Sequence, residues 1–229
     1  MQVDKNILVE VLEIKQETPS FFDLKLTPLL EQNFPFQSGQ YVFLTHSSGQ
    51  KECFAIASEP EEKNFIQFLI KDKEGINHEL CHLKKGDPLK ISMPAGTAYP
   101  FDKIKGKDLI LVGIGSALAP LRSLVKSIMR RDQLFGKIIL VYGARKKEEI
   151  PYWNDFKLWN NKFEIHFALS QEASQLEKMI KGRVNDVLTG LEFGNHFAAC
   201  ICGNKTMEAE VTKLLETKGI SKQNIFLNY

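Results

Sequence analysis

The hydrophobic pattern of the chain changes near residue 104, and this change constrains the fold more than any other feature of the sequence. Before it, short apolar or alternating runs follow one another closely, separated by turn residues. After it, apolar runs alternate with patterns of helical period. Closely spaced short strands are typical of an antiparallel barrel or sandwich, whereas strand–helix alternation favours a parallel sheet covered on both faces by helices. We therefore predict two domains, residues 1–103 and 104–229, joined by a linker at residues 99–103.

The individual runs predict where the elements lie. In the first domain, strands are expected at residues 7–14, 21–26, 41–45, 53–57, 65–70 and 89–92, with one helical segment at residues 77–83. In the second domain, strands are expected at residues 109–112, 138–142, 163–168, 197–201 and 225–227, and helices at 118–131, 153–159, 184–188 and 206–218. The second domain is thus predicted to be an α/β, Rossmann-like unit.

Composition excludes several classes of protein. Of the 229 residues, 43% are hydrophobic and 25% are charged, which is typical of a globular chain and excludes disorder over most of its length. The apolar run at residues 109–121 is too short to span a bilayer, and no signal-peptide pattern opens the chain, so we expect a cytoplasmic protein without membrane contact. The four cysteines form no C-x-x-C pair, which predicts reduced thiols and no metal or iron–sulfur site. Any redox chemistry would then need an organic cofactor.

Charge is distributed unevenly between the two halves. The first 103 residues contain 11 lysines, no arginine and 15 acidic residues, whereas the remainder contains 19 basic residues, among them all five arginines, and 13 acidic ones. A nucleic-acid binder usually has a denser basic stripe with interleaved aromatic residues. We therefore expect no nucleic-acid partner, and the basic half suits small phosphorylated molecules.

Small and phosphate-binding residues follow four of the expected parallel strands. Gly113, Gly115, Ser116 and Ala117 form a turn after the first strand, and Pro120 then opens a helix. The other strand ends carry further residues of this kind: Gly143, Arg145, Ser170, Gly203 and Met207. Parallel sheets bind ligands at the carboxyl ends of their strands, where helix N-termini attract phosphate. The glycine turn alone is also compatible with a plain strand-to-helix connection, since Leu118 occupies the third glycine position of the G-x-G-x-x-G fingerprint.

The order and spacing of several motifs resemble the ferredoxin–NADP reductase-like family of FAD- and NAD(P)-binding oxidoreductases. The matching segments are F-x-x-G-Q-Y-V at residues 36–42, a diphosphate-binding helix start at 75–78, L-x-x-G-D at 83–87, a G-S-x-x-A-P nucleotide loop at 115–120, Y-G-x-R at 142–145 and C-G-x-x-x-M at 202–207. The resemblance covers almost the whole chain. It implies a flavin-binding barrel followed by an NAD(P)-binding domain, and an enzyme that passes a hydride from NADH or NADPH to FAD and then electrons to an acceptor, either a small molecule or a redox protein.

The resemblance also implies which residues form the site. Those expected to bind the flavin are Cys53, Phe54, Ala55, Ile56, Ile70, Lys71, Gly75, Ile76, Asn77 and His78, and those expected to bind the nicotinamide dinucleotide are Gly115, Ser116, Ala117, Pro120, Gly143, Arg145, Ser170, Gly203 and Met207. Cys202 and Tyr229 are the expected catalytic residues, the first beside the nicotinamide and the second stacked on the flavin. Without the family, Cys202 would be an ordinary core thiol, His78 a surface residue and Tyr229 a frayed end.

The sequence departs from the family at its flavin motif. Where the family has R-x-Y-S/T, this chain has Glu52, Cys53, Phe54 and Ala55, and its nearest cations are Lys71 and Lys73. Lysine is a point charge without the bidentate fork of arginine. After Ser170 the chain continues with Gln171 and Glu172, which favours NADH, although Arg145 and Lys146 keep NADPH open. We therefore retain two hypotheses: a flavin-dependent oxidoreductase, or a nucleotide-binding or regulatory module that has lost its flavin.

Overall fold

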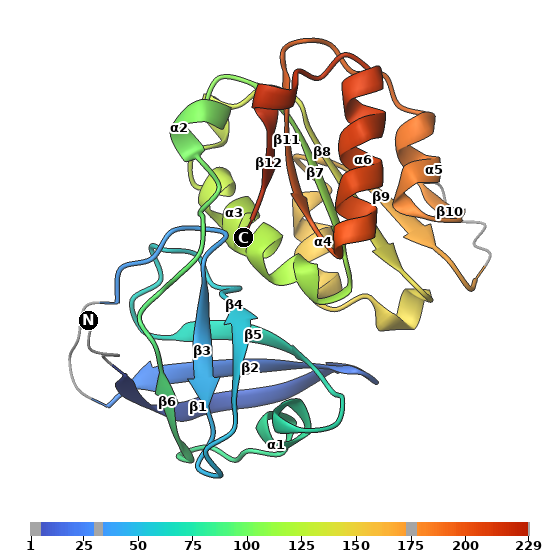
Figure 1. Ribbon diagram of the computed structural model, residues 1–229. Coiled ribbons are helices and arrows are strands. Elements are labelled where there is room, and N and C mark those ends of the chain that lie inside the picture. Colours follow the sequence, from blue (N-terminus) through green and yellow to red (C-terminus); the bar gives the residue numbers. More distant parts are fainter. Residues whose placement is uncertain (1–5, 30–33, 173–177, 229) are drawn as a thin grey trace.

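The computed structural model describes residues 6–29, 34–172 and 178–228, and places them in two packed lobes (Figure 1). The N-terminal lobe is a barrel of antiparallel strands, and the C-terminal lobe is a parallel sheet between helices. This is the two-domain architecture that the change in hydrophobic pattern predicts. Among the described residues, no helix combines the length and the apolar character that crossing a bilayer requires.

The start of the first barrel strand alternates between buried and solvent-facing side chains, whereas the fifth strand is buried over five consecutive residues. In the first strand Ile7, Val9 and Val11 point inward, while Leu8 is exposed. The strands are β1 (Ile7–Thr18), β2 (Phe21–Pro28), β3 (Tyr41–Thr45), β4 (Lys51–Ala55), β5 (Ile66–Lys71) and β6 (Pro88–Ile91), and helix α1 (Ile76–Cys81) follows β5. Their order is β4-β3-β6-β1-β2-β5, and a bridge between Ile56 and Phe68 joins the two edges. Closure leaves the barrel core filled by aliphatic and phenylalanine side chains.

The second lobe contains a six-stranded, wholly parallel sheet. Its strands are β7 (Asp108–Ile114), β8 (Ile138–Ala144), β9 (Glu164–Leu169), β10 (Met179–Lys181), β11 (Phe197–Cys202) and β12 (Ile225–Leu227), in the order β10-β9-β8-β7-β11-β12. The central strands are continuously apolar because both of their faces are covered. Helices α3 (Leu118–Met129) and α4 (Trp153–Trp159) cover one face, and α5 (Val184–Thr189) and α6 (Lys205–Thr217) cover the other.

Several strands are longer than the sequence-based expectation, such as β1, which runs to Thr18 instead of residue 14. Three further features also differ. Strand β4 begins and ends two residues before the expected run 53–57, because it pairs in register with β3. Strand β10 was not expected, since three residues are too few to show a periodicity. The expected linker at residues 99–103 contains helix α2 (Phe101–Ile104), and Tyr99 is buried there. The domain boundary itself stays a prediction.

The two lobes share one hydrophobic core. Phe21, Ala57 and Leu69 of the barrel are buried in the same cluster as the α3–α4 side of the parallel sheet. Helix α3 lies along the barrel, and the two residues that directly follow it form ion pairs with the barrel, Arg130 with Glu59 and Arg131 with Glu61. The lobes are therefore joined by both apolar and charged contacts along this helix.

Candidate functional site

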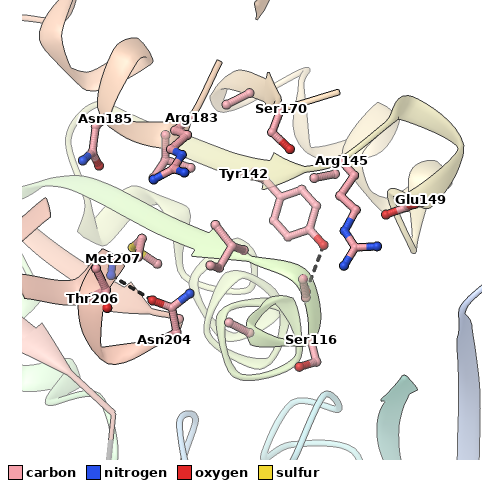
Figure 2. Close-up of a pocket in the computed structure, with 18 of the residues that line it drawn as sticks. Ser116, Tyr142, Arg145, Glu149, Ser170, Arg183, Asn185, Asn204, Thr206 and Met207 are labelled. Carbon is pink, nitrogen blue, oxygen red and sulfur yellow. Dashed lines mark hydrogen bonds between the residues drawn. The ribbon is translucent and has the colours of Figure 1, made fainter. Parts of the chain in front are cut away.

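A cavity of about 990 Å³ lies at the carboxyl ends of β7, β8, β9 and β11 (Figure 2). The α/β lobe supplies most of its wall, and the barrel contributes Phe21 and Lys71, which pair across β2 and β5. Carboxyl ends of adjacent parallel strands meet at one edge of a sheet, so the small residues that follow each strand gather there. The cavity is the place where the expected nucleotide site should lie.

The turn after β7 forms one side of the cavity. Gly115, Ser116 and Ala117 make a 3₁₀ turn that runs directly into α3. Gly115 has a φ of 54°, which favours glycine, and a Cβ added at Gly113 would lie only 2.5 Å from Leu121 Cδ1. Both glycines are thus required by the path of the backbone. Pro120 is buried in the first turn of α3 and does not line the cavity.

A buried tyrosine holds this turn in place. Tyr142, near the end of β8, donates a hydrogen bond from its hydroxyl to the carbonyl oxygen of Gly115 at 2.9 Å. Burial raises the pKa of Tyr142, so the phenol remains a neutral donor at physiological pH. The ring fills the space between the strand and the turn, and it forms part of the cavity wall.

The ends of β8, β9 and β11 complete the wall with residues that the sequence singled out. Arg145 and Ser170 lie on one side and Met207 lies on the other (Figure 2), and Gly143 and Gly203 also line the cavity. Asn204 caps α6, since its Oδ1 accepts a hydrogen bond from the backbone N–H of Met207 at 2.9 Å. Of the nine residues expected to bind the nicotinamide dinucleotide, all except Pro120 line this one cavity.

Sequence reasoning missed a second group of lining residues, which comes from the segment around α5 and from α6. Arg183 precedes α5 and follows Gly182, while Asn185, Lys205 and Glu210 lie on the two helices. Asn185 donates from Nδ2 to Glu210 Oε2 at 2.9 Å, and its Oδ1 is buried without a hydrogen-bond partner among the described residues. The sequence Gly182–Arg183 before a helical run is a helix-start signal that could have indicated Arg183.

The arginines at the lobe interface form ion pairs, whereas those that line the cavity do not among the described residues. Arg122, Arg130 and Arg131 each form an ion pair. The guanidinium groups of Arg145 and Arg183 have no such partner among residues 6–29, 34–172 and 178–228, and both line the cavity. Two unpaired guanidinium groups beside small residues at the edge of a parallel sheet are suited to binding phosphate oxygens.

This geometry has counterparts among known proteins. Residues 111–213 match the family model of the oxidoreductase NAD-binding domain. The chain is 28% identical to sulfhydrogenase 2 subunit gamma of Pyrococcus furiosus, over 95% of this chain and 81% of that protein. It resembles a ferredoxin NADP⁺ reductase from Neisseria gonorrhoeae, crystallised with FAD and NADP, with a TM-score of 0.83, 19% identity, and 97% and 98% of the two chains covered.

The chain is thus similar to the ferredoxin–NADP reductase-like oxidoreductases, in the sequence of residues 111–213 and in its two-lobed fold.

A further relative is longer than this chain. The F component of the Na⁺-translocating NADH-quinone reductase of Histophilus somni is 30% identical over 77% of this chain, and the match spans 48% of the length of that relative. The matching unit thus makes up most of some relatives and about half of others.

The residues at the family's flavin positions are divided between the barrel core and its surface. Ile56 and Ile70 are fully buried in the barrel core, and Phe54 and Ile76 are nearly so. Their side chains therefore shape the barrel from within and present almost no surface to a ligand. Cys53 is exposed, and Ala55 packs against the core that the lobes share.

The segment expected to meet the flavin diphosphate is rich in hydrogen-bonded acids. Glu52 pairs with Lys73 at 2.9 Å. His78 Nδ1 lies 3.0 Å from Asp72 Oδ1, and Asn77 is buried and donates from Nδ2 to the carbonyl oxygen of Lys71. Gly75 has a φ of 85°, and no atom lies closer than 3.9 Å to an added Cβ, so the backbone there is open to close approach. The cation next to residue 52 is thus Lys73, and it is already paired.

The two expected catalytic residues have different outcomes. Cys202 ends β11 next to Gly203 but does not line the cavity. Burial, and to a smaller extent the charge of Glu208, raises the pKa of its thiol to about 12. A hydrogen bond from Asn228 opposes this shift more weakly. A thiol with so high a pKa is protonated at neutral pH and is a poor nucleophile. Tyr229 lies outside the described residues. Asn228 donates from Nδ2 to the carbonyl oxygen of Gly39 at 3.1 Å, so the strand end before Tyr229 contacts the barrel.

Proposed function

We propose that the protein is an NAD(P)H-dependent flavin oxidoreductase that passes electrons to an acceptor. The observation that carries this proposal is the cavity at the strand ends, where Arg145 and Arg183 are unpaired among the described residues and where Phe21 and Lys71 of the barrel form the facing wall. A nucleotide bound there would lie between the two lobes, with its phosphates on the α/β side. The similarity to oxidoreductases in sequence and in fold supports the same assignment.

The residues present fit a nicotinamide dinucleotide. The turn of Gly115 to Ala117 allows close approach of phosphate to the backbone, and α3 begins there with its N–H groups. Arg145, which follows β8, and Arg183 supply two positively charged hydrogen-bond donors, and Ser170, which follows the neighbouring strand β9, supplies a hydroxyl. Glu149 and Glu210 also line the cavity, and these carboxylates suit ribose hydroxyls better than phosphate.

The residues toward the flavin fit its ring better than its diphosphate. Ala55 packs at the shared core and Phe21 faces the cavity, so the barrel presents a small apolar surface opposite the nucleotide turn. Lys71 and Lys73 are the cations nearest the expected diphosphate, with the backbone of Gly75 to His78 beside them. When bound, the flavin would accept a hydride from the nicotinamide and release electrons singly or in pairs. The chain's own part is to bind both cofactors, orient them and exclude water.

The direct test is spectroscopic and needs no knowledge of the acceptor. The purified protein, loaded with excess FAD or FMN and gel-filtered, should keep a flavin absorbance, which NADH or NADPH should bleach without oxygen. Comparing the two nucleotides also decides between NADH and NADPH. A protein that remains colourless after incubation with either flavin contradicts the proposal.

A second candidate function is nucleotide binding without flavin, as in a regulatory module. The ion pair of Glu52 with Lys73 favours it, since a carboxylate stands where the family has arginine. This alternative predicts that NAD(H) or NADP(H) raises the melting temperature whereas FAD does not. A ligand that binds the folded state stabilises it by an amount that increases with its affinity.

Glu52→Arg distinguishes the two candidates. If the diphosphate passes residue 52, replacing a carboxylate by a guanidinium should tighten FAD binding by roughly tenfold or more, because a charge-assisted hydrogen bond contributes about 1.5–3 kcal/mol. Titration followed by flavin fluorescence measures the dissociation constant, with Glu74→Arg as a control for net charge alone. Unchanged or weaker binding would show that the diphosphate does not pass residue 52.

A further inference from the structure

A buried polar network crosses from one lobe to the other beside the cavity. Its centre is Arg122 of α3, whose side chain is 6% exposed. Arg122 donates from Nη1 to the carbonyl oxygen of Ala57 at 2.9 Å and to Gln67 Oε1 at 2.8 Å, and from Nε to Asp155 Oδ2 at 2.6 Å. Ala57 and Gln67 belong to the barrel, whereas Asp155 belongs to α4. One guanidinium therefore joins both lobes.

Gln67 extends the network in the opposite direction. Its Nε2 lies 2.7 and 2.8 Å from the two carboxylate oxygens of Asp23, which is 4% exposed. Asp23 also accepts a hydrogen bond from the hydroxyl of Tyr152 at 2.6 Å. Gln67 thus hydrogen-bonds to both Arg122 and Asp23, using its carbonyl oxygen for the first and its amide for the second.

Tyr152 adopts a backbone conformation that non-glycine residues rarely adopt. Its φ is 55° and its ψ is 37°, and it immediately precedes α4. The Arg122 guanidinium lies 4.2 Å from the centre of its ring, so the tyrosine contacts both ends of the network. A strained residue persists only where its surroundings fix it, and such residues often mark functional constraints. Here the strain directs the phenol across the interface to Asp23.

The network lies on the same elements that form the two walls of the cavity. Phe21 of β2 and Lys71 of β5 line the cavity, and Asp23 and Gln67 lie further along these strands. On the opposite wall, α3 begins at the turn of Gly115 to Ala117, and Arg122 is in the first half of that helix. A shift of α3 along the barrel would therefore move the nucleotide turn relative to the barrel wall.

We propose that Gln67 is a positioning residue: through Arg122 and Asp23 it fixes the nucleotide turn against the barrel, and so sets the distance across which the hydride passes. This inference rests on the proposed function. Its consequence is that loss of the network lowers the rate of flavin reduction while nucleotide affinity, which depends on the α/β wall, changes little. A misplacement of about 1 Å can slow such a reaction roughly a hundredfold.

The first experiment uses Gln67→Met, which keeps side-chain length but removes both hydrogen-bonding ends. Glu61→Gln is the matched control, because Glu61 pairs with Arg131 across the same interface at a partly exposed position. In flavin-loaded protein we expect Gln67→Met to slow anaerobic flavin reduction at least tenfold, with the dissociation constant for NAD⁺ or NADP⁺ within about twofold of the parent. Equal losses of rate and affinity, or no loss of rate, would overturn the proposal.

A rescue variant separates positioning from simple destabilisation. Gln67→Glu alone places two carboxylates face to face and should slow flavin reduction. Adding Asp23→Asn restores every donor and acceptor, since Glu at 67 accepts from Arg122 and from the new amide, while Asn at 23 still accepts from Tyr152. The double variant should recover most of the parent rate. Failure to exceed the single variant's rate counts against the network.

The position of the lobes can also be measured without any flavin. Spin labels on the exposed Cys53 of the barrel and on Glu216→Cys at the exposed side of α6 report the distance between the lobes. The parent should give a narrow distance distribution, and Gln67→Met a broader or shifted one. An unchanged distribution overturns the inference even if the protein binds flavin, whereas a colourless protein with a broadened distribution contradicts only the proposed function.

Discussion

The roles of the five arginines are decided by what each guanidinium meets, although all five lie in one half of the sequence. Arg122 lies in the first half of α3, and Arg130 and Arg131 directly follow that helix; all three contact acids or carbonyls of the barrel or of α4. Arg145 and Arg183 have no ion pair among the described residues and line the cavity. The uneven charge of the chain therefore reflects both an interface and a binding site, and only the second was expected.

Neutralising either cavity arginine should weaken nucleotide binding. Arg145→Gln and Arg183→Gln each remove a charged donor to phosphate, and a hydrogen bond to a charged group contributes about 1.5–3 kcal/mol. We expect the dissociation constant for NADH or NADPH, measured by calorimetry, to rise roughly tenfold to a hundredfold. Arg131→Gln is the control, and an effect of equal size there would mean that overall charge, not the cavity, determines binding.

Asp23 should make stability fall as pH rises. Desolvation raises its pKa above the ordinary 3.8, against the opposing hydrogen bonds from Tyr152 and Gln67 and the charge of Arg122. The folded state thus holds this proton more tightly than the unfolded state. Its contribution to stability is present below pH 3.8 and is lost as pH rises through the raised pKa.

Urea unfolding at several pH values checks the sign of this effect. The free energy of unfolding of the parent minus that of Asp23→Asn should decrease as pH rises above 3.8, the ordinary pKa of this carboxyl. Asp132→Asn serves as the opposite case, since the hydrogen bond from Lys162 lowers the pKa of Asp132 and its contribution grows as pH rises. A parent-minus-Asn difference that is flat or rising for Asp23 contradicts the assignment.

At the scale of elements, the unit formed by β7, the glycine turn and α3 determines the site. The strand and the helix were predicted from periodicity because both are long and regular. The lining residues around α5 were not predicted, because β10 is three residues long and α5 is six, so the segment shows little pattern. Strand ends could be read from the sequence because every parallel strand finishes at the same edge of the sheet.

Glycine substitutions test how tightly this unit is packed. Gly113→Ala places a Cβ 2.5 Å from Leu121 Cδ1 near the buried end of β7, and overpacking of this kind costs about 1–3 kcal/mol. Gly203→Ala instead meets the flexible tip of Met207, which can move into the cavity. We expect thermal melts to show a drop of several degrees for Gly113→Ala and a smaller one for Gly203→Ala, and the reverse order would contradict this packing.

At the scale of the molecule, the lobes are coupled more strongly than a two-domain pattern in the sequence indicates. The boundary near residue 104 was visible as a change in period, but nothing in the period indicated that Phe21, Ala57 and Leu69 would be buried under α3 and α4. Those contacts join residues far apart in the chain, and they depend on how two finished lobes meet. Sequence patterns describe each lobe by itself and leave their interface undetermined.

Removing the buried guanidinium of Arg122 should therefore destabilise the whole molecule. Arg122→Met leaves Asp155 without its ion-pair partner and Gln67 without its donor, and removal of one partner from a buried pair costs about 3–5 kcal/mol. Arg131→Gln, at a partly exposed pair, should cost about 0–1 kcal/mol. Urea unfolding followed by circular dichroism measures the loss of stability in both variants. Similar losses would mean that the Arg122 network contributes no more to stability than the partly exposed pair.

The shared core also has a consequence for how the chain is made. The N-terminal lobe leaves the ribosome first, and domains emerging during synthesis usually fold in that order. Until residues 118–159 follow, Phe21, Ala57 and Leu69 have no helices to cover them. A nascent chain paused at this stage would expose an aggregation-prone apolar face. We therefore expect chaperones to bind the partly synthesised chain and not to bind the completed protein.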